Sequence, residues 1–357
     1  MSSNFAYRYV SLTPEHTTST GVRSYGTASA GSDAELFGEV DDESFQHLFE
    51  LLTRNDMSHY GVSKSLNGKE YSEGGLNLVA QGDDFCGMLF YGVYGDKSSA
   101  DSTAYTFDGS TETHTFKEGK DHILPSFTIK VGREDKEHTY TGMCVSRLGL
   151  SATVGEYVTL SADFTGKAES AQGALESSVT YTGSGADGLH FADGVIKFSS
   201  DGAANSAVAS IKSISFEINT NLNTDDACSI GSQTYSRQPE PQLREITGTI
   251  EFSRPVMTAD ASTDAPSYAQ LTATDGLAYT GDAADAAISA QFSSAGTGDI
   301  KFEVFKCRFE APSVNVSGRD SSTMTVNFVG LYDTTVEAMS RTTVIVEGNA
   351  KGRYSTL

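Results

Sequence analysis

The sequence of 357 residues contains no tryptophan, only seven prolines and few basic residues. Its 25 lysines and arginines stand against 47 aspartates and glutamates, which gives a formal net charge of −22 at pH 7. A protein that reads nucleic acid sequence needs a basic surface to neutralise phosphates, so this charge excludes that class. The charge is compatible with a channel wall that repels DNA and lets it slide. It is equally compatible with an acidic surface adapted to concentrated salt, where screening weakens self-repulsion.

Clustered metal and redox ligands are also missing. The four cysteines, Cys86, Cys144, Cys228 and Cys307, are widely spaced without a CxxC pair, and the seven histidines are scattered. Zinc sites need closely spaced ligands, so we expect no metal and no cofactor. The run 183–188 matches the GxGxxG pattern of dinucleotide-binding loops. No strand–helix unit surrounds this run, and we therefore predict no nucleotide site there.

Long apolar runs and catalytic spacings are absent too. No apolar segment approaches the ~18 residues of a membrane-spanning helix, and the amino terminus lacks the apolar core of a signal peptide, so we expect the chain to be made in the cytoplasm. No Ser/His/Asp arrangement is visible by spacing. We interpret the paired carboxylates Asp83–Asp84 and Asp225–Asp226 as solvated turn residues of an acidic chain. The sequence therefore predicts a protein that is not an enzyme.

The most informative feature present is the similarity of two distant segments. One runs from Cys144 to VTLSADFTG at 158–166, and the other from Cys307 to TMTVNFVG at 323–330. Phe164 and Phe328 lie 164 residues apart, and the two cysteines lie 163 apart. A repeat of this length is a whole small domain rather than a solenoid module. We therefore predict an internal duplication, which favours assembly over catalysis.

Alternating apolar residues and frequent Val, Thr, Tyr and Phe predict a mainly β protein. Residues 1–170 are expected to form a first β domain, 171–205 a connection rich in Gly, Ser, Ala and Asp, and 206–357 a second β domain. One short helix is expected at 41–54, where acidic residues precede Phe45, Leu48, Phe49 and Leu52 at helical spacing. The segments 158–164 and 324–328 have a period of two and predict strands with one wet face.

Several segments resemble the major tail tube proteins of long-tailed, non-contractile (siphovirus-like) viruses. They are FGEVDDESF at 37–45, PSFTI at 125–129 with YTG at 140–142, and SFEINTN at 215–221 followed by REITGTI at 244–250. The resemblance covers most of the chain and includes no catalytic signature. It implies two tandem tail-tube-type β-sandwich or half-barrel domains. The strong acidity departs from typical members and points to a virus of a halophilic, archaeal host.

The resemblance also implies an assembly. Family members join in a continuous barrel, in rings of six domains that stack into a hollow tube, so two domains per chain imply a homotrimer with pseudo-sixfold symmetry. The chain would then be a structural virion protein of the tail, with viral DNA passing non-specifically through the lumen at ejection. The expected partners are further copies of the chain, a tape measure protein, a tail terminator and a distal tail protein, and no membrane.

Two surfaces follow from this hypothesis. The wet strand faces are expected to line the lumen, with Thr159, Ser161, Asp163, Thr325 and Asn327. The loop at 231–242 is stiffened by its prolines and suits an arm that reaches a neighbour. Candidate residues for contacts between rings are Tyr235, Arg237, Pro239 and Pro241, together with Lys64 and Lys69. Two alternatives stay open: a surface adhesin of sandwich domains, and a β-rich carbohydrate-active enzyme, although the latter usually stacks sugars on tryptophan.

Overall fold

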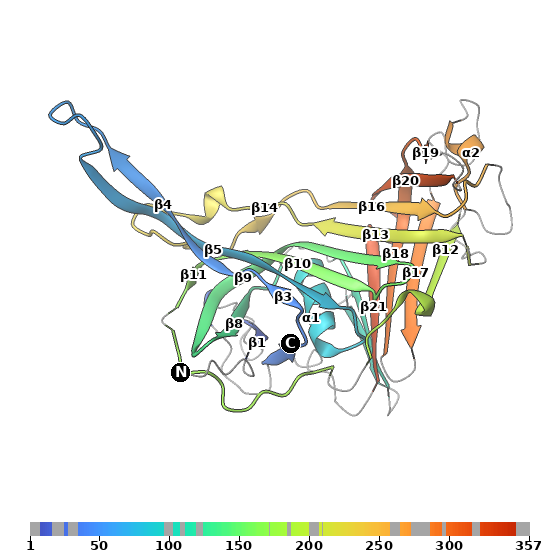
Figure 1. Ribbon diagram of the computed structural model, residues 1–357, viewed down its shortest axis with the longest axis horizontal. Coiled ribbons are helices and arrows are strands. Elements are labelled where there is room, and N and C mark those ends of the chain that lie inside the picture. Colours follow the sequence, from blue (N-terminus) through green and yellow to red (C-terminus); the bar gives the residue numbers. More distant parts are fainter. Residues whose placement is uncertain are drawn as a thin grey trace.

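The computed structural model describes residues 8–15, 25–27, 35–95, 103–107, 111–118, 124–170, 172–183, 187–199, 207–208, 210–257, 265–272, 286–294, 298–315 and 322–347. Figure 1 shows an elongated, strand-rich molecule from which one long hairpin projects. Every ladder between two named strands is antiparallel. The mainly β fold predicted from the sequence is therefore confirmed.

The N-terminal half contains two layers that share one long strand. Its elements are β1 (Tyr9–Pro14), β2 (Leu36–Gly38), β3 (Asp42–Glu43), β4 (Gln46–Arg54), β5 (Lys64–Val79), α1 (Asp84–Tyr94), β6 (Thr103–Phe107), β7 (Thr111–Lys117), β8 (Phe127–Arg133), β9 (Lys136–Thr153), β10 (Thr159–Gly166) and β11 (Ala168–Glu169). The first part of β9 pairs with β8 and β11, and its second part pairs with β10. Strand β10 continues to β5, and β5 to β3 and β4.

The C-terminal half is also built mainly of strands. Its elements are η2 (Phe191–Asp193), β12 (Gly194–Ser199), β13 (Ile211–Asn219), β14 (Leu222–Asn223), η3 (Asp225–Ala227), β15 (Glu240–Pro241), β16 (Glu245–Phe252), α2 (Tyr268–Thr272), β17 (Ala286–Ser294), β18 (Gly298–Phe309), β19 (Ser313–Asn315), β20 (Thr323–Gly330) and β21 (Ser340–Glu347). Strand β12 lies inside the segment expected to be a connection and pairs with β17.

The pairings occur in the same order in both halves. The ladder series β1–β8–β9–β10–β5–β4 corresponds to β12–β17–β18–β20–β16–β13. Even a register shift recurs, between Phe127 and Ile129 against β9 and between Ala286 and Ile288 against β18. Cys144 lies opposite Thr165 and Cys307 opposite Gly330, so the two cysteines are one ladder position out of equivalence.

A pair of phenylalanines packs around a glycine at matching places in the two halves. A Cβ atom on Gly74 would lie 2.4 Å from the Cα of Phe45, and one on Gly248 would lie 2.3 Å from the ring of Phe328. Either Cβ would clash. In each half the two phenylalanine rings lie 5.6 Å apart between their centroids. The two trios are Phe45–Gly74–Phe164 and Phe216–Gly248–Phe328.

The halves are joined by two further ladders. In one layer β13 pairs with the second part of β9, and Phe216 lies opposite Leu150. In the other layer β7 of the N-terminal half pairs with β21 along its full length, from Arg341 opposite Lys117 to Glu347 opposite Thr111. The main sheet therefore continues from β4 across both halves to β19, and Figure 1 shows β10, β9, β13 and β16 running side by side.

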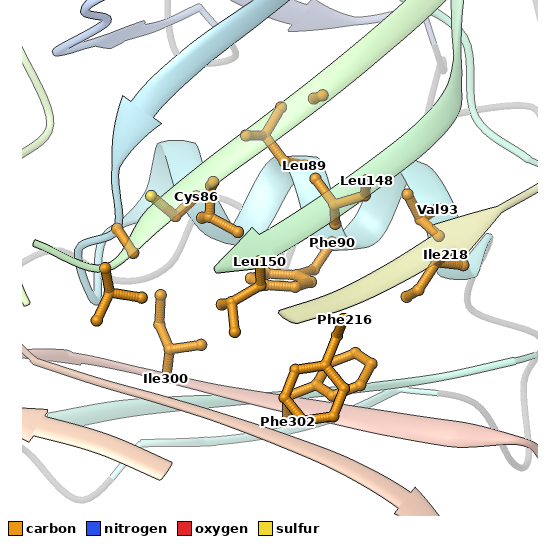
Figure 2. Close-up of a cluster of buried hydrophobic side chains, with 14 of the residues drawn as sticks. Cys86, Leu89, Phe90, Val93, Leu148, Leu150, Phe216, Ile218, Ile300 and Phe302 are labelled. Carbon is orange, nitrogen blue, oxygen red and sulfur yellow. The ribbon is translucent and has the colours of Figure 1, made fainter. Parts of the chain in front are cut away.

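Helix α1 fills the space between the layers. All its residues are buried, and Figure 2 shows Leu89, Phe90 and Val93 beside apolar side chains of β9, β13 and β18. Asp83 is the N-cap of the helix, and its carboxylate accepts a hydrogen bond from the Cys86 N–H at 2.8 Å. The interpretation of Asp83–Asp84 as solvated turn residues is therefore wrong, because both are buried at a helix start.

The helix predicted at 41–54 is wrong, since this segment forms β3 and β4. The spacing of Phe45, Leu48, Phe49 and Leu52 fits a helical stripe, but pairing with β5 determines the structure. Of these residues Phe45 is buried, whereas Phe49 and Leu52 are more than half exposed. The glycine-rich run 183–188 lies partly outside the described residues, and η2 follows it with a single short turn.

Candidate assembly surface

The sheet that crosses both halves has one apolar and one polar face. Leu160, Ala162 and Phe164 of β10 are buried, whereas Thr159, Ser161 and Asp163 point to the opposite, accessible face. Strand β20 repeats this pattern, with Thr325 half-buried and Asn327 exposed. The wet faces predicted for the two strands are confirmed, and their polar side chains share one continuous surface because β10 and β20 belong to the same sheet.

An ion-pair network crosses the junction of the halves on this polar face. The Arg147 guanidinium on β9 donates to Asp163 on β10 at 2.6 Å and to Glu217 on β13 at 3.0 Å. The hydrogen bond to Asp163 raises the pKa of Arg147. Three neighbouring strands are thus tied at the place where the N-terminal half meets the C-terminal half.

Within the described residues, the two ends of this sheet carry free strand edges. In the described ranges β4 pairs only with β5, and β19 pairs only with β20. By the recurring ladders, β4 corresponds to β13 and the second part of β9 corresponds to β19. Inside the chain, β13 and β9 pair with each other. At the two ends of the sheet, the corresponding strands β4 and β19 each lack such a partner in the described ranges.

The distal part of the β4–β5 hairpin is an apolar arm. Figure 1 shows it projecting from the body of the molecule. It carries seven of the seventeen large exposed hydrophobic side chains of the described ranges, namely Phe49, Leu51, Leu52, Met57, Tyr60, Val62 and Leu66. A concentration of this kind on a small element is typical of a protein–protein contact. Sequence reasoning missed this arm because it assigned two of these residues, Phe49 and Leu52, to a helix at 41–54.

The long loop between β13 and β16 lies along the β4–β5 hairpin of the same chain. Tyr235 is buried and stacks on Tyr71 of β5, with 6.3 Å between ring centroids, and Lys69 lies 5.4 Å above its ring. Gln233 accepts the Glu70 N–H through its backbone oxygen at 2.8 Å. Of the other residues predicted to contact a neighbouring ring, Pro239 is buried, Pro241 is half-buried, and Arg237 and Lys64 are exposed.

Buried polar groups link the halves on the side of α1. The Arg244 guanidinium donates to the Val93 carbonyl at the end of α1 at 2.7 Å and lies 3.8 Å from Glu118. Glu118 in turn accepts the backbone N–H groups of Met339 and Ser340 at 2.9 and 3.2 Å. Burial lowers the pKa of Arg244, and it raises that of Asp83 at the other end of the helix.

A cavity with a volume of about 1030 Å³ lies beside β3 and the β8–β9 turn. Its wall includes Glu43, Arg133, Glu134, Asp135 and Asp187. No group of three or more His, Cys, Asp or Glu side chains in the described part of the chain is placed to hold a metal ion. Neither helix there is long and apolar enough to cross a membrane.

Comparison with known proteins identifies the family. The model of a phage tail tube protein family matches residues 17–338. No curated protein sequence matches the chain. The match covers most of the chain, in agreement with the strand-rich fold. The chain therefore belongs to the phage tail tube protein family, a family of structural virion proteins.

Proposed function

We propose that three copies of this chain close into a ring with pseudo-sixfold symmetry, and that the rings stack into a hollow tail tube. The observation that carries the proposal is the β9–β13 junction, where two similarly paired halves meet. In the described ranges the corresponding strands at the two ends of the sheet, β19 and β4, have a free edge. Free edges of long sheets aggregate or are paired, and closure of a ring pairs all of them. The recurring ladder order supports an internal duplication with domains near 1–170 and 206–357.

The internal junction gives a register for the contact between chains. Ser161 lies opposite Gly149 just as Thr325 lies opposite Ser313, which relates β9 to β19. Phe216 lies opposite Leu150 inside the chain. The corresponding contact would place Phe45 of one copy opposite Val314 of the next.

The polar face of the sheet would line the bore. Thr159, Ser161 and Asp163 in one half and Thr325 and Asn327 in the other offer small polar or acidic groups. An acidic wall repels the phosphates of DNA, so a duplex would pass without binding. The net charge of −22 further supports a virus with a halophilic archaeal host. The long non-contractile tail is proposed on the resemblance of the segments at 37–45, 125–129 and 215–221. Tape measure, terminator and distal tail proteins are the partners expected along such a tube.

The apolar arm on the β4–β5 hairpin would make the contact between stacked rings. Leu52 and Leu66 lie opposite each other on this hairpin, and both are more than half exposed. The buried loop residue Tyr235 would support the arm from one side through Tyr71. Arg237 and Lys64, which are exposed near the same hairpin, remain candidates for the rim of that contact.

Negative-stain electron microscopy in high salt, combined with mass measurement in solution, tests this function. We expect hollow tubes and a smallest closed species of three chains. The double variant L52K/L66K should form rings that do not stack, whereas Y332K, which changes an exposed tyrosine outside the arm, should form tubes. Folded monomers at every salt concentration would overturn the ring, and tubes of normal length from L52K/L66K would overturn the role of the arm.

A further inference from the structure

The free edge of β3 and β4 is not bare, because side chains of the same molecule occupy its central position. Phe45 lies between the two strands, and its N–H donates to the Glu43 carboxylate at 3.0 Å. Its carbonyl oxygen accepts hydrogen bonds from the Arg133 guanidinium at 2.6 Å and from the Tyr140 hydroxyl at 3.2 Å. Both backbone groups of Phe45 are therefore satisfied without a neighbouring strand.

These two groups are the ones that would bind a neighbour. The preceding residue, Ser44, donates its N–H inward to the Gly75 carbonyl on β5 at 2.9 Å. Successive residues of a strand direct their backbone groups to opposite sides. The N–H and C=O of Phe45 therefore face away from β5, toward the free edge.

Glu43 and Arg133 form a close pair. Arg133 donates from Nε to Oε1 of Glu43 at 2.9 Å and from Nη2 to Oε2 at 2.5 Å, in bidentate geometry. Its Nη1 donates to the Tyr140 hydroxyl at 3.1 Å, and its guanidinium lies 6.0 Å from the centre of that ring. Arg133 is the last residue of β8, and the two-residue turn after it places it beside the edge. Both residues line the cavity beside β3 and the β8–β9 turn.

The other half of the chain shows the same position occupied by a strand. Phe216 corresponds to Phe45, since each packs on a phenylalanine 5.6 Å away and against a glycine of the next strand. Phe216, however, lies opposite Leu150 of β9 in a continuous ladder. At Phe45 the Glu43–Arg133 pair occupies the place that β9 takes at Phe216.

We propose that the Glu43–Arg133 pair is a latch that caps the β3–β4 edge of the unassembled chain and must leave Phe45 before β19 of a second copy can pair there. This inference rests on the ring proposed above and concerns how assembly of that ring is regulated. The latch protects a free edge from unspecific pairing. It is an accessible ion pair, with side chains 32% and 22% exposed, so rising salt loosens it. Assembly of this ring is therefore slow in dilute salt and fast in concentrated salt.

The variants R133M and E43A test the latch, and R341M is a matched control. Arg341 makes two contacts with Glu303, at 2.7 and 2.6 Å, and lies over the Phe305 ring, but it does not touch the β3–β4 edge. Monomer isolated in dilute salt is shifted to tube-forming salt, and light scattering follows assembly. We expect the lag of both latch variants to shorten about tenfold, the change that loss of a charge-assisted hydrogen bond produces. The lag of R341M should equal that of the wild type.

Amide hydrogen exchange in the isolated monomer provides a second readout. The Phe45 amide should exchange about tenfold faster in E43A than in the wild type, because its acceptor is lost. Wild-type lag times and exchange rates in variants with native near-UV circular dichroism would overturn the latch while leaving the ring intact. A wild-type chain that forms no rings at any salt concentration would overturn the ring, and the latch with it.

Discussion

His114 should make the stability of this chain depend on pH. Its side chain is fully buried on β7, opposite Val344 of β21, in one of the two ladders that join the halves. Burial lowers the pKa of His114 from 6.5 to about 4. Between these values the unfolded chain binds a proton at this residue and the folded chain does not. Stability is therefore fully present above pH 6.5 and is lost as the pH falls toward 4.

The size of the effect follows from the shift. Each pH unit within the window costs about 1.4 kcal/mol, so the complete loss by pH 4 is about 3 kcal/mol. The chain carries no net charge near pH 4.6 and would precipitate there, so the measurement is confined to higher pH. Between pH 7 and pH 5.5 the contribution of His114 to the free energy of unfolding should fall by about 1 kcal/mol.

Urea unfolding of wild type and H114L at constant ionic strength measures this contribution. Carboxylates also titrate in this range, so the quantity of interest is the difference between the two proteins at each pH. H114L should be less sensitive to acid than the wild type by about 1 kcal/mol. F116L, which changes a buried neighbour on the same strand, should lose stability but keep the wild-type pH dependence. Parallel pH profiles for wild type and H114L would refute the reasoning.

Two further predictions concern the packing of the halves. R244M should lower the free energy of unfolding by about 3–5 kcal/mol, because it leaves the buried Glu118 carboxylate without its cation; denaturant titration of R244M against R244M/E118L, which should recover part of the loss, checks this. G248A should cost about 1–3 kcal/mol, since a Cβ would lie 2.3 Å from the Phe328 ring and from the Ser215 carbonyl oxygen, and a thermal melt no lower than that of wild type would contradict it.

Strands with one face on the core and the other in water could be predicted from the sequence. In β10 and β20 the alternation of apolar and polar residues is a local signal, because one face packs on the core and the other meets water. Helix α1 escaped prediction because it is buried on all sides, and an apolar run without periodicity does not distinguish helix from strand. The segment at 41–54 was misassigned because Phe49 and Leu52, which fit a helical spacing, project from an exposed hairpin.

The candidate site depended on information that no local pattern contains. Phe45 lies at a free edge because of the order of strands across the sheet. Ladders between residues far apart in the sequence set this order. Arg133 reaches that edge only because the β8–β9 turn brings it beside residue 43. A signal did exist for the similar order of ladders in the two halves, since Phe164 and Phe328 each pack on a second phenylalanine 5.6 Å away.

The equivalent positions of the two junctions differ in charge in a way that suits assembly in salt. Inside the chain the polar face at the junction holds Arg147 between Asp163 and Glu217. By the recurring ladders, the corresponding residues at the free ends are Ala311, Asn327 and Gln46, and none of them is charged. Screening weakens ion pairs at an accessible surface but leaves backbone hydrogen bonds and apolar packing intact. A contact between chains built on backbone hydrogen bonds and apolar packing would hold at salt concentrations that release the Glu43–Arg133 pair from Phe45. A rise in salt would therefore free the β3–β4 edge without weakening the contact between chains that pairs it.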